Sequence, residues 1–242
     1  ASRHDGTAES GALLKPTSAS GHNVGIIVVA RDDFTIEWLD ISMDSLDSTN
    51  TNKAINISTG AGNCTIRNML IHDKGGNPGS SGPVAIASGL SLTTSENWYF
   101  LNNIIYNMIE TSNDSAMGIN IRSFIGSLYI YNNTIYKIKS NGGSKDAVAL
   151  RFGDGTHIQA NIKNNLVAGL DEGDIAAAYW MDEIPNSNRV LNSATNLSDD
   201  TTDAAKDAED FDVNKNDATA LIGKTLAQIA FVSTSAGSED LH

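Results

Sequence analysis

The chain has 242 residues, of which 40% are hydrophobic and only 6% aromatic, and its formal net charge is -13. A core must therefore come mainly from Ile, Leu, Val and Ala, which suits thin stacks of short strands. The acidic balance argues against a nucleic-acid partner, because phosphate binding needs a basic surface. No membrane insertion is expected either, since no segment approaches the roughly 18 apolar residues of a membrane span.

Composition also predicts a compartment and the state of the one cysteine. An acidic surface rich in Asn, Ser, Thr and Gly, with few Lys, is typical of secreted or cell-surface proteins, so we expect an extracellular location. Cys64 has no second cysteine with which to form a disulfide. It starts an apolar segment, where a free cysteine usually behaves as a small buried hydrophobe. The chain begins at Ala1 rather than Met, as a processed chain or a fragment would.

The first strands are expected after a polar N-terminal extension. Residues 1–23 are Gly- and Ser-rich and are predicted to lead into the first coil as strand or loop. Residues 25–30 (GIIVVA) form a continuous apolar run, the pattern of a strand buried in a parallel sheet. Residues 34–43 are predicted to form the next pair of strands.

The rest of the chain up to about residue 167 repeats one pattern. Each copy has a leading strand, a tight turn, a second strand, an Asn pair and a third short strand. The predicted copies are 54–58 with 64–71, 89–93 with 98–108, 118–122 with 128–138, and 147–152 with 158–167. The first apolar residues of the second strands follow at steps of 30, 34, 30 and 32: Ile36, Ile66, Phe100, Ile130 and Ile162. Such a period predicts a repeat architecture.

Two sets of positions set the expected alignment of the coils. The leading strands are aligned on inward-facing apolar residues: Ile57, Leu92, Ile121 and Leu150. The Asn residues form one column and a second column directly after it: Asn68, Asn102, Asn132 and Asn164, then Asn103, Asn133 and Asn165. Asn tolerates the left-handed conformation, and stacked amides can bond along the axis at the spacing of about 4.8 Å between strands. An internal Asn ladder is predicted.

The segments INIS…TIRNMLI, LYIYNNTIY and IKNNLV resemble the right-handed parallel β-helix superfamily of pectate-lyase-like repeat proteins. The resemblance implies an all-β fold, a right-handed parallel β-helix solenoid of about five to six coils with an Asn ladder and long polar loops. It covers residues 24–185, after the extension of residues 1–23. It leaves activity open, because lyases, hydrolases, tailspikes and adhesins share the repeat.

Residues 186–242 are predicted to form an acidic loop and a closing segment, the latter with a short helix or turn and a last strand at 221–232. Asp210, Asp212 and Asn214 alternate as in the first half of a Ca²⁺ loop. However, Lys215 replaces the Gly that such a loop requires, and Leu221 stands where a bidentate acid belongs. A solvated acidic loop is the alternative interpretation.

Candidate chemistry lies on the outward positions after the leading-strand core residues: Ser58, Thr93, Arg122 and Arg151. Arg122 and Arg151 are predicted to stack on adjacent coils, where two guanidinium groups could hold a uronate carboxylate. Lys145, Asp146 and Asp154 are expected near the same strand ends. Polysaccharide lyases of the resembled superfamily use a basic residue as proton abstractor and acidic residues to hold Ca²⁺. The alternative is a set of ordinary surface ion pairs.

A second candidate is an outward aromatic column of Tyr106 and Tyr136, with His72 one coil before. Stacked exposed rings would suit the apolar faces of sugars, while sheet stabilisation by cross-strand stacking is the alternative. The motifs of polygalacturonase-type hydrolases are missing, and no facing pair of carboxylates can be placed.

Two classes of function follow. The favoured hypothesis is a secreted or cell-surface structural or adhesive module without a cofactor, whose ends stack into a homo-oligomer, fibre or filament. The alternative is a Ca²⁺-dependent polysaccharide lyase, or a passive glycan-binding module, that acts on an extracellular polysaccharide.

Overall fold

The structure is a computed structural model. It describes residues 3, 7–8, 11–16, 25–44, 53–58, 61–74, 82–88, 96–111, 114–122, 125–141, 145–153, 157–171, 175–181 and 189–198. These residues form strands and turns, and no helix occurs among them.

The strands form three sheets, which we call A, B and C. Sheet A contains β1 (Ala12–Leu14), β4 (Leu39–Ser42), β7 (Leu70–Lys74), β10 (Ile104–Glu110), β13 (Thr134–Ser140), β16 (Leu166–Ala168) and β19 (Leu197–Ser198). Sheet B contains β2 (Ile27–Val29), β5 (Lys53–Ile57), β8 (Val84–Ser88), β11 (Ala116–Ile121), β14 (Asp146–Phe152) and β17 (Ile175–Met181). Sheet C contains β3 (Phe34–Glu37), β6 (Cys64–Arg67), β9 (Glu96–Leu101), β12 (Ile125–Tyr131), β15 (His157–Lys163) and β18 (Arg189–Ala194).

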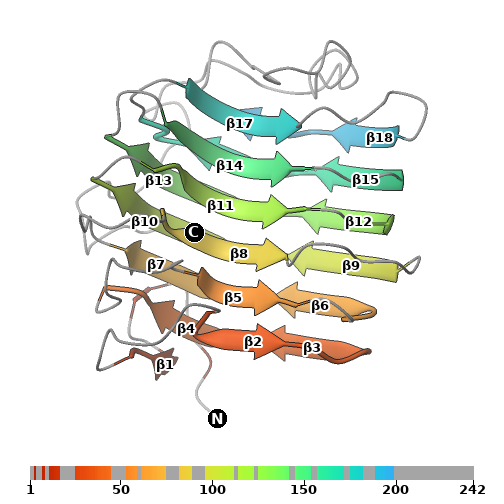
Figure 1. The fold of residues 1–242 in the computed structure, drawn as a ribbon, viewed down its shortest axis with the longest axis horizontal. Helices are drawn as coiled ribbons and strands as arrows, with labels where there is room; N and C mark the ends of the chain where they lie inside the picture. Colours follow the sequence, from red (N-terminus) through yellow and green to blue (C-terminus); the bar gives the residue numbers. More distant parts are fainter. Residues whose placement is uncertain are drawn as a thin grey trace.

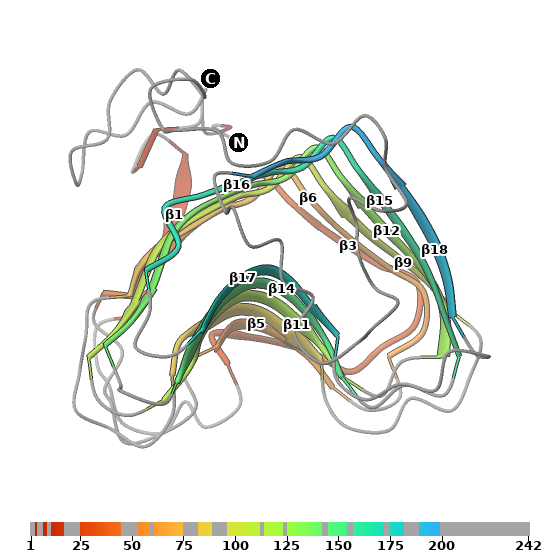
Figure 2. The same ribbon diagram turned by 90° about the horizontal axis from the view of Figure 1, so that it is seen from above.

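The chain passes through sheets B, C and A in turn and then starts the next coil above (Figure 1). Every strand pairs in parallel with the strand of the same sheet in the next coil; for example, β10 pairs with both β7 and β13. The view along the stack shows the three sheets as the walls of one solenoid (Figure 2). The predicted parallel β-helix is confirmed. Beyond the predicted boundaries, β1 extends sheet A downwards, and β18 and β19 extend sheets C and A upwards.

The apolar core consists of columns that run up the inside of each sheet. In sheet A, one such column is fully buried and contains Ile41, Ile71, Ile105, Ile135 and Val167. Cys64 is 1% exposed, as predicted, and burial raises the pKa of its thiol. Stacked β-branched side chains of this kind suit the pleated surface of a strand.

The Asn ladder is confirmed, and the two Asn columns have different structural roles. The first column takes the left-handed conformation at the corner between sheets C and A, with φ of 53°, 54°, 56° and 55° at Asn68, Asn102, Asn132 and Asn164. The second column is buried and gains a further member, Asn196, above Asn165. Each of its amides donates to the next amide above, at 2.9 to 3.0 Å. The second column is therefore the internal polar ladder.

The predicted alignment of the leading strands is wrong in two coils. In the third coil the leading strand is β8, whereas the predicted segment 89–93, with Leu92, lies outside the described residues. Ile57 pairs with Ser88, and Ile121 pairs with Phe152 rather than with Leu150. Two short apolar runs follow each other in this part of the sequence, at 84–88 and 89–93, and periodicity alone does not show which of them forms the leading strand.

Sheet B is bent so that its outer side is concave (Figure 2). Small buried residues occupy the level of the bend in successive strands: Ala54, Ala85, Gly118, Ala149 and Ala178. A Cβ at Gly118 would lie 2.6 Å from the carbonyl oxygen of Ala149 and 3.1 Å from the side chain of Ile135 in sheet A. A small residue at this position lets sheet B approach sheet A.

Candidate functional site

The outer side of sheet B carries basic side chains, and two of its columns define its chemistry. The column nearer the strand starts is Lys53, Val84, Met117 and Val148. The column nearer the strand ends is Val28, Asn56, Ala87, Asn120 and Arg151. Neither column contains Asp or Glu, although the chain has 29 acidic and 16 basic residues. We call Lys53, Asn56, Asn120, Arg122 and Arg151 the basic face.

Lys53 and Arg122 come from opposite ends of their strands, and the charge of Arg122 acts on Lys53. Lys53 lies at the start of β5, and its Nζ donates to Oδ1 of Asn56 at 3.2 Å. Arg122 directly follows β11, and its backbone N–H donates to Oγ of Ser88 at 2.6 Å. Burial lowers the pKa of Lys53, and the positive charge of Arg122 lowers it further. Lys53 is therefore a partly desolvated cation that also experiences the positive charge of Arg122.

Asn120 adds an acceptor to the basic face. Its Oδ1 is buried and has no hydrogen-bond partner among the described residues. The register neighbour below it is the small Ala87, and the neighbour above is Arg151. Next to these polar groups, Val84, Ala87, Met117 and Val148 form a separate apolar cluster on the outside of the sheet. The basic face thus combines cations, a buried acceptor that lacks a donor, and an apolar strip.

The predicted pairing of Arg122 with Arg151 on adjacent coils is wrong. Arg151 pairs with Asn120, whereas Arg122 lies level with Gly153, whose N–H donates to the carbonyl oxygen of Ile121 at 2.8 Å. The two arginines are thus offset by two positions along the sheet. The two arginines are 29 residues apart in sequence, whereas the register between β11 and β14 is 31 residues.

Asp146 and Lys145 lie at the other end of β14 from Arg151. Asp146 begins the strand, and Arg151 is near its end. Asp146 is 9% exposed, and its Oδ2 accepts a hydrogen bond from Oγ of Ser115 at 3.4 Å. Lys145 comes directly before β14, next to Asp146. Ser58 donates to the carbonyl oxygen of Val29, while Thr93 and Asp154 lie outside the described residues. Sequence reasoning missed Lys53, a basic residue at the start of β5 whose column lies on the outer side of sheet B.

The aromatic column of sheet A exists, but it is not exposed. Tyr106 pairs with His72 below and with Tyr136 above, as predicted. Tyr106 is 3% and Tyr136 is 1% exposed, and both belong to a buried cluster with Leu70 and Ala168. The expectation of an exposed platform is therefore wrong, and the ring contacts fit sheet packing. Sugar binding through these rings stays a prediction.

His72 belongs to a buried polar chain that spans three coils. Its Nε2 lies 2.7 Å from Oδ1 of Asp40, and its Nδ1 lies 2.7 Å from Oδ2 of Asp73. Asn107 donates to the other oxygen of Asp73 at 2.9 Å, and the ring of His72 stacks on Tyr106 at 5.2 Å. Burial opposes a charge on His72, but the hydrogen bonds and charges of Asp40 and Asp73 outweigh it and raise its pKa to about 9. A histidine that stays charged near neutral pH between two carboxylates holds coils together rather than exchanging protons in that range.

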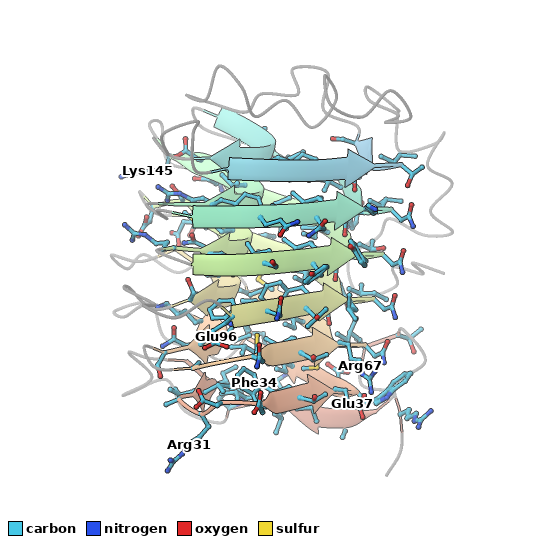
Figure 3. The ribbon with its side chains drawn as sticks, turned by 90° about the vertical axis from the view of Figure 1, so that its right-hand side faces the viewer. Arg31, Phe34, Glu37, Arg67, Glu96 and Lys145 are labelled. Atoms are coloured by element: carbon cyan, nitrogen blue, oxygen red, sulfur yellow. The ribbon has the colours of Figure 1, made fainter. Side chains whose placement is uncertain are left out.

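Sheet C carries an aromatic group that the sequence analysis missed. The rings of Tyr99 and Tyr129 stack at 4.6 Å, and Tyr131 meets Tyr129 edge to face at 6.1 Å. Below them on the same outer face, Arg67 and Glu37 form an ion pair at 2.6 Å (Figure 3). The available signal was the spacing of Tyr99 and Tyr129, which equals the step from Phe100 to Ile130. Because the stacked ring faces cover each other, we interpret this group as a cross-strand contact that stabilises sheet C.

Within the ranges that the structure describes, no group of three or more His, Cys, Asp or Glu side chains is placed to hold a metal ion. The predicted Ca²⁺ ligands Asp210, Asp212 and Asn214 lie outside those ranges, as does the segment 221–232. The described residues also contain no helix that is long and apolar enough to cross a membrane.

Comparisons with protein-family models, with curated proteins and with solved structures find no match for this chain. The fold and the site therefore define the class: an all-β parallel β-helix protein with an Asn ladder and a basic outer face on one bent sheet.

Proposed function

We propose that this protein is an extracellular structural or adhesive module that binds an acidic polysaccharide along the basic face of sheet B. The observation that carries the proposal is the set of basic side chains on the outer side of sheet B, together with the lowered pKa of Lys53, which burial and the charge of Arg122 cause. Like charges that act on each other are unfavourable, and a carboxylate beside Lys53 would relieve both the repulsion and the desolvation. The two outer columns that contain Lys53 and Arg151 include no Asp or Glu.

The other features of the basic face fit a carboxylated sugar better than a simple anion. Asn120 offers an acceptor for a sugar hydroxyl, whereas Val84 and Met117 beside it are 7% exposed and offer little contact area. The positions repeat at about 4.8 Å along the axis, so an extended chain could follow the stack. Membership of the pectate-lyase-like superfamily and location outside the cell belong to this same proposal, and the acidic, Asn-rich composition supports the latter.

Titration calorimetry with a polyuronate, and with a neutral polysaccharide as comparison, tests the proposal. We expect binding of the polyuronate alone, with an affinity that falls as salt concentration rises. Arg122→Gln should weaken it about tenfold or more, the cost of losing a charged hydrogen bond. Lys163→Gln removes the same charge from the outer face of sheet C and is the matched control. Equal loss in both variants, or equal binding of the neutral polymer, would contradict the proposal.

A second candidate function is polysaccharide cleavage by β-elimination, and the lowered pKa of Lys53 favours it. A lysine that is easier to deprotonate can act as the base that removes the proton next to a uronate carboxylate. The electron pair then forms the carbon–carbon double bond as the glycosidic bond breaks, and Arg122 would hold the carboxylate. The leaving oxygen takes a proton from water.

The two candidates separate in one assay. Cleavage produces an unsaturated sugar that absorbs ultraviolet light, so absorbance is followed during incubation with a polyuronate, with Ca²⁺ or with a chelator. A rise in absorbance that is lost in Lys53→Met supports elimination. Binding with no rise under either condition supports the passive module and contradicts elimination.

A further inference from the structure

Exposed apolar side chains gather at one end of the solenoid. Among the described residues, the large hydrophobic side chains that are exposed are Leu13 and Leu14 at 36% each and Val28 at 46%. They lie on β1 and β2, the lowest strands of sheets A and B in Figure 1. We call the end formed by β1, β2 and β3 the lower end.

The core opens at this same end. Ile27 and Ile36 point inward and are partly exposed, whereas Ile55 and Ile66, directly above them, are fully buried. Phe34 is also partly exposed and lies at the lower end in Figure 3. Within the described residues, β2 and β3 end their sheets, so no strand pairs with their lower edges. Open strand edges beside apolar surface favour pairing with another strand.

We propose that the lower end binds the lower end of a second copy of this chain, about a two-fold axis perpendicular to the solenoid. The proposal is independent of polysaccharide binding. Its basis is the step that β1 makes: sheet A extends one strand below β4, while sheets B and C stop at β2 and β3.

The step disfavours a continuous head-to-tail stack. In such a stack, β17 and β18 of the copy below would meet β2 and β3. Its β19 continues the same coil into sheet A, where it would need the place that β1 already fills. An end that cannot repeat in this way does not propagate into a fibre.

The two-fold arrangement uses the step instead. An axis through the middle of sheet B, below β2, sets β2 antiparallel to the same strand of the second copy. It also exchanges the positions of sheets A and C, so that β1 of each copy lies below β3 of the other. Val28 is the central residue of β2 and therefore lies opposite Val28 of the second copy. Directly opposite Cβ atoms in antiparallel strands are about 4.5–5.5 Å apart.

Disulfide trapping of the full chain tests this arrangement. Val28→Cys should give a covalent dimer on mild oxidation, because opposed Cβ atoms lie near disulfide distance. Asn141→Cys is the matched control, because Asn141 is exposed and directly follows β13, away from the lower end. The native Cys64 is buried in both variants. Absence of a covalent dimer in Val28→Cys, or equal cross-linking in both variants, overturns the proposal.

Sedimentation provides the second readout and needs no cross-link. The native protein should sediment at twice its monomer mass of 25.6 kDa, and Val28→Lys should shift it to the monomer mass with an unchanged circular dichroism spectrum. Filaments would indicate a head-to-tail contact and would overturn the two-fold arrangement. A native monomer at high concentration would overturn the contact itself.

Discussion

Asn133 donates a hydrogen bond from its Nδ2 to Oδ1 of Asn165, with 2.9 Å between the atoms. The same Nδ2 reaches the carbonyl oxygen of Phe100 at 2.9 Å. Its Oδ1 accepts from the backbone N–H of Asn103 at 3.0 Å and from the amide of Asn103 at 2.9 Å. One buried side chain thus joins three coils through backbone groups that would otherwise lack partners.

Replacement of Asn133 should therefore be costly. In Asn133→Ala the buried N–H of Asn103 and the carbonyl of Phe100 lose their partner, so we expect a loss of about 3 kcal/mol in the free energy of unfolding. Urea denaturation measures it. Asn132→Gly is the control, because Asn132 is exposed with φ of 56°, a conformation that Gly adopts freely. Comparable losses in the two variants would sink the assignment of the second column as the ladder.

The interactions of His72 with Asp40 and Asp73 should make the stability of the fold fall at both high and low pH. The pKa of His72 is raised from 6.5 to about 9, so its contribution is complete below pH 6.5 and is lost as pH rises through 9. The hydrogen bond from His72 lowers the pKa of Asp73, so the contribution of Asp73 is present above pH 3.8 and is lost as pH falls through the lowered value. Thermal melts across this range should show a plateau between these limits.

The alkaline decline should belong to His72 itself. In His72→Gln no imidazolium remains, so the melting temperature should be lower on the plateau and should no longer fall between pH 6.5 and 9. An undiminished alkaline decline in this variant would show that other groups cause it.

Lys53→Met should stabilise the protein in the absence of ligand. The folded pKa of Lys53 is lowered, so the unfolded chain binds this proton more tightly and the charged lysine costs stability below the folded pKa. Met continues the apolar column of Val84, Met117 and Val148. The melting temperature near neutral pH should rise, and the gain should shrink as pH rises through the pKa of Lys53. A lower melting temperature would show that the ammonium group stabilises the fold.

The repeat made the architecture predictable from sequence. The apolar residues at Ile36, Ile66, Phe100, Ile130 and Ile162 do form one inward column of sheet C. The Asn pairs at 102–103 and 132–133 mark the sharp corner because only a few residue types tolerate the left-handed conformation there. Both signals are local, and each recurs in several coils.

The candidate site was less predictable because it depends on register and on residues far apart in sequence. Side chains of a strand alternate between its faces with a period of two. A shift of two residues therefore leaves the same face outward, and the alternation cannot show that Arg151 pairs with Asn120 rather than with Arg122. Lys53 lies far from Arg122 in sequence, and no local pattern indicates that the charge of Arg122 acts on it. The burial of Tyr106 and Tyr136 on an outer face likewise has no local signal.

The pKa of Lys53, followed by nuclear magnetic resonance of its side chain with and without a polyuronate, tests the central claim most directly. The account predicts a pKa below the ordinary 10.5 in the free protein and a rise when the polymer saturates the basic face, with no rise for a neutral polysaccharide. An ordinary pKa in the free protein, or a value that the polyuronate leaves unchanged, would contradict it.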